Sequence, residues 1–529
     1  MRRRLTWGLT AVIAVLAMPM PAHSETGIDA SPKTHVAGID SASDPGGPRS
    51  TEVPRLVRAG SDLRAIPAGS QPATPGESGG ILAPTVLPPT FDGVPDLADV
   101  SPGDPTGALG LTHHLAAVNV HMAFYDRAGL EVDPPRRLRS LDDQLPAGVR
   151  DFDPKVVYDA YRQHFLLVFA SASNTRSFLS LVVIPEGSEA VTADWCVLHM
   201  SGDQVRNNGK QLADYPMLGF TEDRVTLTTN QFDYSDAPFA GGFQYVQVVS
   251  MRKAQLYDCS VPVVPIKVFS RTQTRDPDGS RAFTIVPTVS TGGAPTTQYM
   301  TSLDFNGSTG KLILWRLKAV DGVLKLSKVS LGGGGMAYPP WGRQCGNTTG
   351  LNSKWDTGDL RLTSSFLDSA LGRLYTTTAM TGNIGGGAVE SVVRWWEVDP
   401  SSVLANSDVT RKGRVGVAGR DVAWPSIATD GDGKVWVNYA RAGAPECLAA
   451  YAGVVQPGAT SSSSILIQAG FGRYEYGPGV ERWGDYTAIS RDPLDPSTMA
   501  AYGAYPIDDG EGGTATDLWQ QVIATLTDV

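Results

Sequence analysis

The chain has 529 residues, a formal net charge of −10 and a hydrophobic content of 41%. This acidic balance makes nucleic acid and anionic membrane surfaces poor partners, because both repel a negatively charged protein. The 58 glycines, 37 prolines, 17 tyrosines and 11 tryptophans favour tight turns and strands over helices, which indicates an all-β protein.

The first 24 residues have the pattern of a secretory signal peptide. A basic start at residues 2–4 precedes an apolar run at residues 5–18 and the small-residue site Ala22-His23-Ser24. A membrane anchor is the alternative, but the apolar run is shorter than the ~20 residues that a span requires. We therefore predict cleavage before Glu25 and a secreted, extracellular protein with no membrane span after the signal is removed.

Residues 25–80 are rich in Pro, Gly, Ser and Ala and show no sustained periodicity. Such a composition offers too little apolar surface to offset the entropy of ordering the chain, so it predicts a disordered linker. Residues 81–86 end this composition and could form a first strand. The sequence thus predicts a folded domain over residues 81–529.

A short unit recurs along that domain. It consists of a polar or aromatic residue, a small residue or proline, an alternating run and an acidic turn residue, and its clearest copy is RWGDYTAISRDP at residues 482–493. The seven copies begin near Thr106, Asp153, Tyr215, Val286, Asp359, Trp424 and Tyr486. Each is followed by a β-rich run, at residues 115–119, 165–169, 225–229, 297–303, 374–378, 435–439 and 499–502, as in a series of hairpins.

The spacing of the units leaves room for three or four short antiparallel strands in each. Repeated four-stranded sheets that close into a ring form a β-propeller, in which closure removes the exposed sheet edges. A β-sandwich would not give seven similar units, and a β-helix has a much shorter repeat. We therefore predict a seven-bladed β-propeller. Because the last unit shows only three strands, a segment within residues 81–94 is expected to supply its fourth.

The four cysteines, Cys196, Cys259, Cys345 and Cys447, all follow the signal peptide. An oxidising destination favours two disulfides, for which three pairings exist; we favour Cys196 with Cys259 and Cys345 with Cys447. The cysteines lack the close pairwise spacing of a zinc site, so no metal is predicted. Nothing in the sequence requires a cofactor.

Several of the units begin with motifs that occur in a fixed order. They are residues 104–110 (DPTGALG) with Asn119, Asp153-Pro154 with Tyr158-Asp159, Asp214-Tyr215-Pro216 with Asn230, residues 356–362 (DTGDLRL) and residues 482–486 (RWGDY). Across residues 90–529 the chain resembles secreted bacterial β-propeller proteins that are distantly similar to the sialidase-type propellers. The resemblance implies the propeller fold. Sialidase chemistry is disfavoured, because the sequence has no Tyr-Arg-Ile-Pro-like segment and only one loose Asp-box, at residues 302–309.

In a propeller the innermost strands line a central channel, and the loops leading into them gather on one face, where ligand sites form. If the unit starts lie there, their charged and aromatic residues converge into a funnel. The ligand-binding candidates are Asp104, Asp153, Asp214, Asp359, Arg361, Asp421, Trp424, Arg482, Trp483, Asp485 and Tyr486, with Tyr215 as a further aromatic surface. Carboxylates accept hydroxyl protons, Arg binds uronate or sialate carboxylates, and aromatic rings cover the apolar face of a pyranose, so the set suits a carbohydrate. Alternatively, each Asp caps its own strand turn and each ring packs between blades.

Two function classes follow from this set. The first is a secreted propeller with a funnel site for a carbohydrate or polysaccharide, such as a glycoside hydrolase or a polysaccharide lyase. A hydrolase needs two carboxylates ~5 to 9.5 Å apart; a lyase needs a base, for which His113, His114 and His121 are candidates. The second class is a non-catalytic extracellular binding or adhesion propeller whose partner is a glycan or a cell-envelope component. The sequence alone assigns no catalytic residue.

Overall fold

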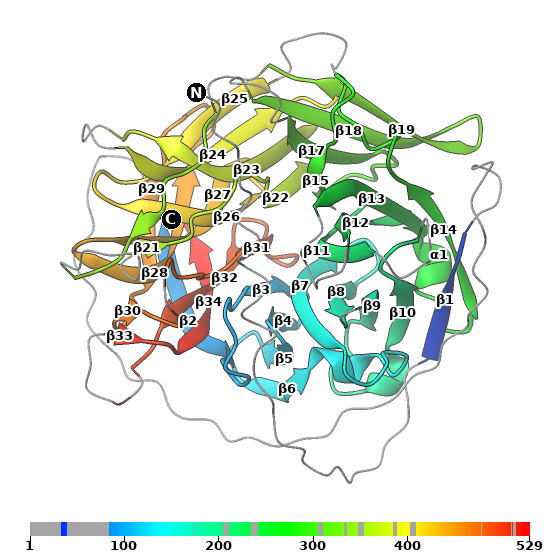
Figure 1. Ribbon diagram of the computed structural model, residues 1–529, viewed down its shortest axis with the longest axis horizontal. Coiled ribbons are helices and arrows are strands. Elements are labelled where there is room, and N and C mark those ends of the chain that lie inside the picture. Colours follow the sequence, from blue (N-terminus) through cyan, green and yellow to red (C-terminus); the bar gives the residue numbers. More distant parts are fainter. Residues whose placement is uncertain are drawn as a thin grey trace.

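The computed structural model describes residues 33–39 and 84–528, apart from 174, 205–210, 234–241, 305–309, 333–335, 347–353, 385–388, 402–408, 478, 509 and 511–514. The described chain forms a seven-bladed β-propeller, so the all-β class and the number of blades predicted from the repeats are confirmed (Figure 1). Each blade contains four antiparallel strands, and the blades surround a central channel.

The blades follow one another in chain order, and in blades 1 to 6 the first strand is the innermost. Blade 1 contains β3 (Thr106–Leu109), β4 (His113–Val118), β5 (His121–Asp126) and β6 (Glu131–Arg137). Blade 2 contains β7 (Arg150–Asp159), β8 (His164–Ala172), β9 (Ser177–Pro185) and β10 (Cys196–Ser201), and blade 3 contains β11 (Gln211–Phe220), β12 (Arg224–Asp233), β13 (Phe243–Arg252) and β14 (Val263–Phe269). Blade 4 contains β15 (Phe283–Pro287), β17 (Gln298–Asp304), β18 (Lys311–Val320) and β19 (Val323–Ser330).

The second half of the ring repeats this arrangement. Blade 5 contains β22 (Ser364–Asp368), β23 (Arg373–Gly382), β24 (Glu390–Val398) and β25 (Val409–Val415), with β16 (Val289–Thr291) parallel to β22. Blade 6 contains β26 (Asp421–Thr429), β27 (Val435–Gly443), β28 (Glu446–Val455) and β29 (Ser463–Gln468). Blade 7 contains β31 (Ala488–Arg491), β32 (Met499–Pro506), β34 (Trp519–Thr527) and β2 (Thr85–Pro95).

Smaller elements connect the blades. Two short ladders pair β20 (Gly342–Arg343) with β21 (Lys354–Trp355) and β30 (Arg473–Tyr474) with β33 (Ala515–Thr516). The helical segments of the described residues are α1 (Lys253–Leu256) and the 3-10 turns η3 (Leu138–Leu141) and η4 (Thr192–Asp194). Among the described residues, no helix is long and apolar enough to cross a membrane.

Strand β2 closes the ring. It runs antiparallel to β34 as the outermost strand of blade 7, with Thr85 opposite Thr527 and Asp92 opposite Val522. The N-terminal end of the domain, blue in Figure 1, thereby lies beside the C-terminal strand in red. The prediction that a segment within residues 81–94 completes the last blade is confirmed.

The repeated unit corresponds to the innermost strand of a blade and to the residues before it. The predicted β-rich runs overlap the second strands, from β4 in blade 1 to β32 in blade 7. Two units differ in detail. Residues 359–362 precede β22, and residues 286–289 span the end of β15 and the start of β16.

A β-bulge explains why the unit carries a proline. Asp104, Asp153, Tyr215 and Trp424 have positive φ angles of 47°, 51°, 54° and 58°, and each precedes a proline. The ladder register shifts between Phe152 and Lys155, between Asp214 and Met217 and between Ala423 and Ser426. Proline cannot donate to a ladder, and a bulge redirects the side chains beside it. The bulge therefore sets the direction of the unit's polar residues.

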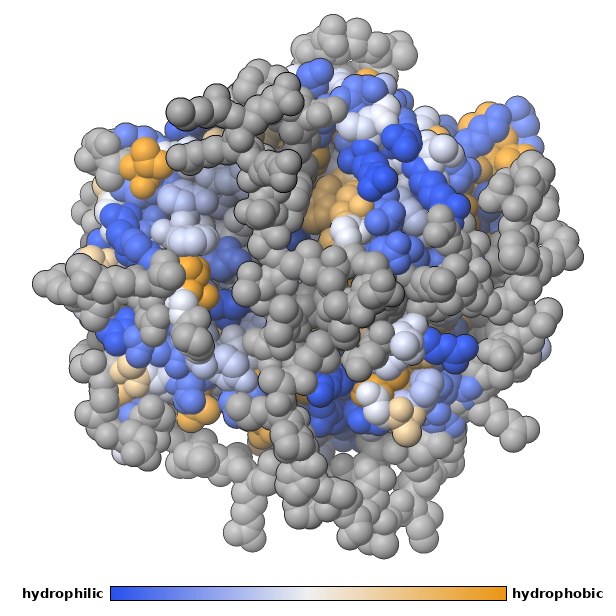
Figure 2. All heavy atoms as spheres, viewed as in Figure 1, coloured by the Kyte–Doolittle hydropathy of each residue, from blue (hydrophilic) through white to orange (hydrophobic). Residues whose placement is uncertain are grey.

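The core lies between adjacent blades. Fully buried tryptophans such as Trp315, Trp395 and Trp436 fill these interfaces, and one cluster joins Trp395, Trp436 and Val522 from blades 5, 6 and 7. Figure 2 shows the face seen in Figure 1, where hydrophilic residues dominate the coloured surface and apolar residues are scattered. Both predicted disulfides are present, Cys196 with Cys259 and Cys345 with Cys447, so the favoured pairing is confirmed.

One part of the predicted linker is a strand. Residues Lys33–Ile39 form β1, which pairs with the outer strands of blades 2 and 3. The remainder of residues 25–80 and the signal peptide lie outside the described residues.

Candidate functional site

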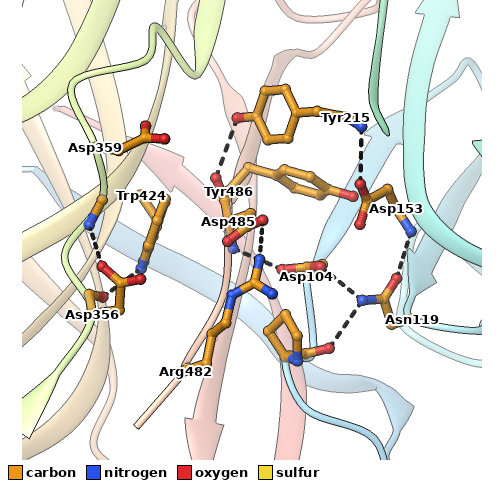
Figure 3. Close-up of polar contacts among 12 residues, drawn as sticks. Asp104, Asn119, Asp153, Tyr215, Asp356, Asp359, Trp424, Arg482, Asp485 and Tyr486 are labelled. Atoms are coloured by element: carbon orange, nitrogen blue, oxygen red, sulfur yellow. Dashed lines mark hydrogen bonds and ion pairs between the residues drawn. The ribbon is translucent and has the colours of Figure 1, made fainter. Parts of the chain in front are cut away.

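A chain of hydrogen bonds joins the inner ends of blades 7, 1, 2 and 3 at one mouth of the channel (Figure 3). The Asp485 N–H and the Asn119 Nδ2 each donate to a different oxygen of Asp104, both at 2.7 Å. The Asp153 N–H donates to Asn119 Oδ1 at 2.8 Å, and the Tyr215 N–H donates to Asp153 Oδ2 at 3.1 Å. Residues from the starts of four units therefore converge.

Two arginine–carboxylate pairs lie at the same mouth. Arg361 donates to both oxygens of Asp359, from Nε at 2.8 Å and from Nη2 at 2.6 Å, and Arg482 pairs with Asp485. The Arg361 guanidinium also lies 4.6 Å from the centre of the Tyr215 ring, which joins this pair to the bonded chain. The Asp359 side chain is 34% exposed and that of Arg482 is 23% exposed, so a ligand can reach both pairs.

The carboxylates at the mouth differ in acidity. Burial and the neighbouring Asp485 raise the pKa of Asp104 to about 7. Burial and the charges of Asp214 and Asp104 raise the pKa of Asp153 well above its ordinary value. Burial also raises the pKa of Asp214 to about 6, against the opposing charge of Arg361.

Asp359 is shifted in the opposite direction. Its burial acts to raise its pKa, but the charge and hydrogen bonds of Arg361 outweigh that effect and hold the pKa below its ordinary value. Asp214 and Asp359 influence each other electrostatically. Near pH 6, therefore, the half-buried Asp214 is partly protonated, whereas Asp359 is ionised.

Lys155, two residues after Asp153, is a buried cation next to this cluster. Its Nζ lies 3.7 Å from the centre of the Tyr486 ring and has no hydrogen-bond partner among the described residues. Burial lowers the pKa of Lys155 to about 7, although the charges of Asp104, Asp153 and Asp485 act to raise it. Lys155 was not among the residues predicted from the sequence, although its place directly after Asp153-Pro154 could have indicated it.

The four predicted aromatic surfaces are buried. Tyr215, Trp424, Trp483 and Tyr486 are each 5% exposed or less. The Tyr215 hydroxyl donates to the Asp485 carbonyl at 3.3 Å, the Tyr486 hydroxyl to the Pro154 carbonyl at 2.6 Å, and Trp424 Nε1 to the Asp356 carbonyl at 3.1 Å. These rings hold the loops of the mouth together.

Exposed rings occur instead on the segment before β20. Tyr338 is 45% exposed and Trp341 is 57% exposed. Partial burial and the charge of Asp359 raise the pKa of Tyr338, which places its hydroxyl within the field of that carboxylate. The Thr357 hydroxyl donates to the Pro340 carbonyl at 2.5 Å and so ties this segment to the loop of Asp359. Neither ring was predicted from the sequence, because both lie outside the repeated unit.

Asp421 and Trp483 contact residues outside the chain of hydrogen bonds at the mouth. Asp421 accepts hydrogen bonds from Arg343 Nε at 2.7 Å and from the Ser391 N–H at 3.0 Å, which tie β20 and blade 5 to blade 6. Trp483 packs edge-on against Tyr474, with ring centres 4.9 Å apart. Asp356, which the prediction omitted, lies at the mouth, and burial raises its pKa.

The three candidate histidines lie in blade 1. His114 shares a hydrogen bond with the Tyr502 hydroxyl at 2.9 Å, and burial lowers its pKa to about 3. Burial lowers the pKa of His121 to about 4. His113, with Glu186 and Glu189, forms a group whose ligand atoms lie within 4.8 Å of one another. Glu186 there accepts hydrogen bonds from the backbone N–H groups of Leu111 and Thr112, which is a structural use of the carboxylate.

The channel behind the mouth contains a cavity of about 300 Å³. Residues from the innermost strand of every blade line it, and most of its wall is apolar or hydroxyl-bearing. Lys155 lines the end near the carboxylates, and Arg491, which donates to the Thr429 carbonyl at 2.7 Å, lines the other end of β31. Charged groups therefore lie at both ends of the cavity, and the wall between them is apolar or hydroxyl-bearing.

Solved structures that are similar to this chain have low sequence identity to it. A protein of unknown function from Dyadobacter fermentans is 10% identical over 73% of this chain and 100% of its own, with a TM-score of 0.38. An α-L-arabinanase from Penicillium chrysogenum is 12% identical over 83% of this chain and 98% of its own, with a TM-score of 0.36. A sialidase from Trypanosoma rangeli is 9% identical over 77% of this chain and 58% of its own, with a TM-score of 0.36. Likenesses at this level carry no argument about the site.

No protein-family model matches the chain, and the search of the curated proteins found no match.

Proposed function

We propose that the protein is a secreted glycoside hydrolase that cleaves a neutral glycan at the mouth of the propeller channel. The observation that carries this proposal is the opposite shift of two neighbouring carboxyl pKa values. The pKa of Asp214 is raised to about 6, and that of Asp359 is held low by Arg361. Two carboxyl groups whose environments separate their pKa values can divide the acid and base roles in the hydrolysis of a glycosidic bond.

The roles follow from the protonation states. Asp214, half-buried and protonated up to about pH 6, is the group that gives a proton to the leaving oxygen. Asp359 is ionised, 34% exposed and held by two hydrogen bonds from Arg361, so it acts as the base or nucleophile.

The charge at the mouth favours a neutral substrate. Arg361 and Arg482 are each paired with a carboxylate, and burial lowers the pKa of Lys155 to about 7. Because both guanidinium groups are already paired with carboxylates, neither is available to bind the carboxylate of a uronate or sialate bidentately. This argues against the polysaccharide lyase considered in the sequence analysis, because a lyase must neutralise a uronate carboxylate.

Tyr338 and Trp341 are proposed to provide the stacking surface that Tyr215 and Tyr486 do not. Exposed aromatic rings beside carboxylates match the two sides of a sugar ring, one apolar and one rich in hydroxyls. Their position on the segment before β20 would extend the site sideways from Asp359.

A specific observation favours a second candidate, a non-catalytic glycan-binding propeller. Asp104 and Asp153 accept backbone N–H groups from neighbouring blades, which is the use expected of structural carboxylates. If Asp214 and Asp359 serve recognition only, the same mouth binds a glycan or a cell-envelope component without cleaving it.

Export is part of the proposal. Two disulfides support an oxidising compartment, since the reducing cytosol of most cells does not maintain them. The signal-peptide pattern of the first 24 residues supports the same destination.

The test is a panel of neutral and acidic polysaccharides, read for binding and for released reducing ends. We expect hydrolysis of a neutral polysaccharide and its loss by about 10² to 10⁴-fold in Asp214→Asn and in Asp359→Asn. Asp432→Asn, at a carboxylate that is 65% exposed on a turn of blade 6, is the matched control and should keep full activity. Binding without cleavage would establish the second candidate, and no response to any glycan would overturn both.

A further inference from the structure

Blades 2 and 3 are joined at their outer edges by a strand from outside the ring. Strand β1 lies between β10 and β14 and unites the two blades in one nine-stranded sheet (Figure 1). It runs parallel to both. Lys33 to Val36 lie opposite Cys196 to His199 of β10, and Val36 to Ile39 lie opposite Val263 to Ile266 of β14.

The two edges that flank β1 are held by other parts of the fold. All six residues of β10 pair with β9, and β14 pairs with β13 from Ile266 onward. The disulfide between Cys196 and Cys259, with a Cα–Cα distance of 5.4 Å, ties the first residue of β10 to the turn before β14. The space between the edges is therefore defined without any contribution from β1.

This space differs from the outer edges of other blades. Within the part of the chain that the structure describes, the sheets of blades 1, 4, 5 and 6 end at β6, β19, β25 and β29, and no strand pairs with these outer edges. Lys33 to Val36 pair with β10 and Val36 to Ile39 pair with β14, so β1 uses the two edges in succession and only Val36 pairs on both sides. An extended chain placed here therefore joins two blades, which a strand added to a single outer edge does not.

We infer that the space between β10 and β14 is a binding site for an extended protein segment, and that residues 33–39 of the same chain fill it. The site recognises its ligand through backbone N–H and C=O groups in parallel register, so its ligand is an extended peptide and not a sugar. Occupation in cis blocks the site in the intact protein. This site is separate from the carboxylates at the channel mouth and does not depend on their function.

The length of the connecting chain supports occupation by the protein's own segment. About 45 residues, 40–84, separate β1 from β2, and such a length can extend up to ~150 Å, far more than is needed to pass from blade 7 to blades 2 and 3. A tethered segment has an effective concentration in the millimolar range, so a free peptide at micromolar concentration would not displace it.

Substitution of Val36 allows a test in the full chain, because Val36 is in register with both neighbouring strands. Val36→Pro removes an N–H and disfavours a position between two strands, so β1 should leave its place. We expect a fluorescent peptide of residues 31–41 to bind full-length Val36→Pro at least tenfold more tightly than wild type, as measured by anisotropy. The same peptide carrying Val36→Pro is the matched control and should bind neither protein.

Two outcomes would overturn the inference. One is a folded Val36→Pro protein that does not bind the wild-type peptide, and the other is equal binding by wild type and variant. If the Val36→Pro chain aggregates, the same measurement on a chain lacking residues 25–40 decides, because the ring is closed by β2 and β34 and needs no part of β1. Melting curves of each variant report whether the ring remains folded.

Discussion

The carboxylates at the mouth fall into two groups that share a chemistry but not an environment. Asp104 and Asp153 are 0% and 8% exposed, and each accepts a backbone N–H from a neighbouring blade. Asp214 and Asp359 are half-buried, and their charges balance against Arg361. The position of these residues in the repeat brings them together at the mouth. Their hydrogen-bond and charge partners then determine which carboxyl groups are available to react.

The largest expected effect is on the pH dependence of hydrolysis. If Asp214 donates the proton, kcat/KM should fall about tenfold for each pH unit above about 6, because the donor is then ionised. Asp359 stays ionised throughout this range, since its pKa is lowered. Initial rates between pH 4 and 9 measure the profile. A rate that stays constant above pH 6 would remove Asp214 from the acid role, whereas the control Asp432→Asn should leave the profile unchanged.

The second-largest expected effect is on stability and concerns the buried carboxyl group of Asp104. Asp104→Asn should lower the free energy of unfolding by about 1 to 3 kcal/mol, because the new amide nitrogen would face a donor, either the Asn119 Nδ2 or the Asp485 N–H. Urea denaturation measures the loss. Asp214→Asn should change stability by less than about 0.5 kcal/mol. Equal losses in the two variants would erase the distinction between the groups.

A third prediction concerns the cation beside the buried group. The folded-state pKa of Lys155 is lowered to about 7, below its ordinary value of 10.5, so between these pH values the unfolded chain binds more protons than the folded chain. Stability should therefore rise as pH increases through this window. Lys155→Met removes the titrating group, and its denaturation midpoints should lack that rise. A parallel rise in both proteins would assign it to another residue.

The smallest expected effect is at the exposed rings. Trp341→Ala should weaken binding of an oligosaccharide by about three- to tenfold while leaving the pH profile unchanged, because a stacking ring contributes contact area but no proton. Phe471→Ala is the matched control, since Phe471 is 51% exposed and lies between β29 and β30. Titration with oligosaccharides of increasing length compares the two. Identical affinities would place the substrate elsewhere on the mouth.

The architecture could be predicted from the sequence because the repeated unit occurs once in each blade. Seven copies of one unit implied seven blades, and the incomplete last copy implied the strand that β2 supplies. The convergence of Asp104, Asp153 and Asp485 also followed, since equivalent positions of a ring meet at its axis. These are consequences of symmetry and need no knowledge of side-chain packing.

The partners of each side chain could not be predicted in this way. Tyr215 and Tyr486 occupy the same kind of position as the acidic residues, but both rings are buried, and each is 1% exposed. Asn119 and Lys155 contact residues of other blades, Asn119 through the Asp153 N–H and Lys155 through the Tyr486 ring, and the sequence does not show these contacts. Tyr338 lies outside the repeat altogether, and the apolar content of residues 25–80 gave no indication of β1.

The clasp in blade 7 has a consequence for the order of synthesis. A chain is made from its N-terminus, so β2 appears before any blade, whereas its partner β34 is the last strand of the domain to appear. Throughout elongation β2 is an unpaired strand that could join a neighbouring nascent chain. It contains Pro88, Pro89 and Pro95, which lack the N–H groups that such a wrong pairing would use. The prolines of β2 thus make the unpaired strand a poor nucleus for aggregation, while they still allow its final pairing with β34.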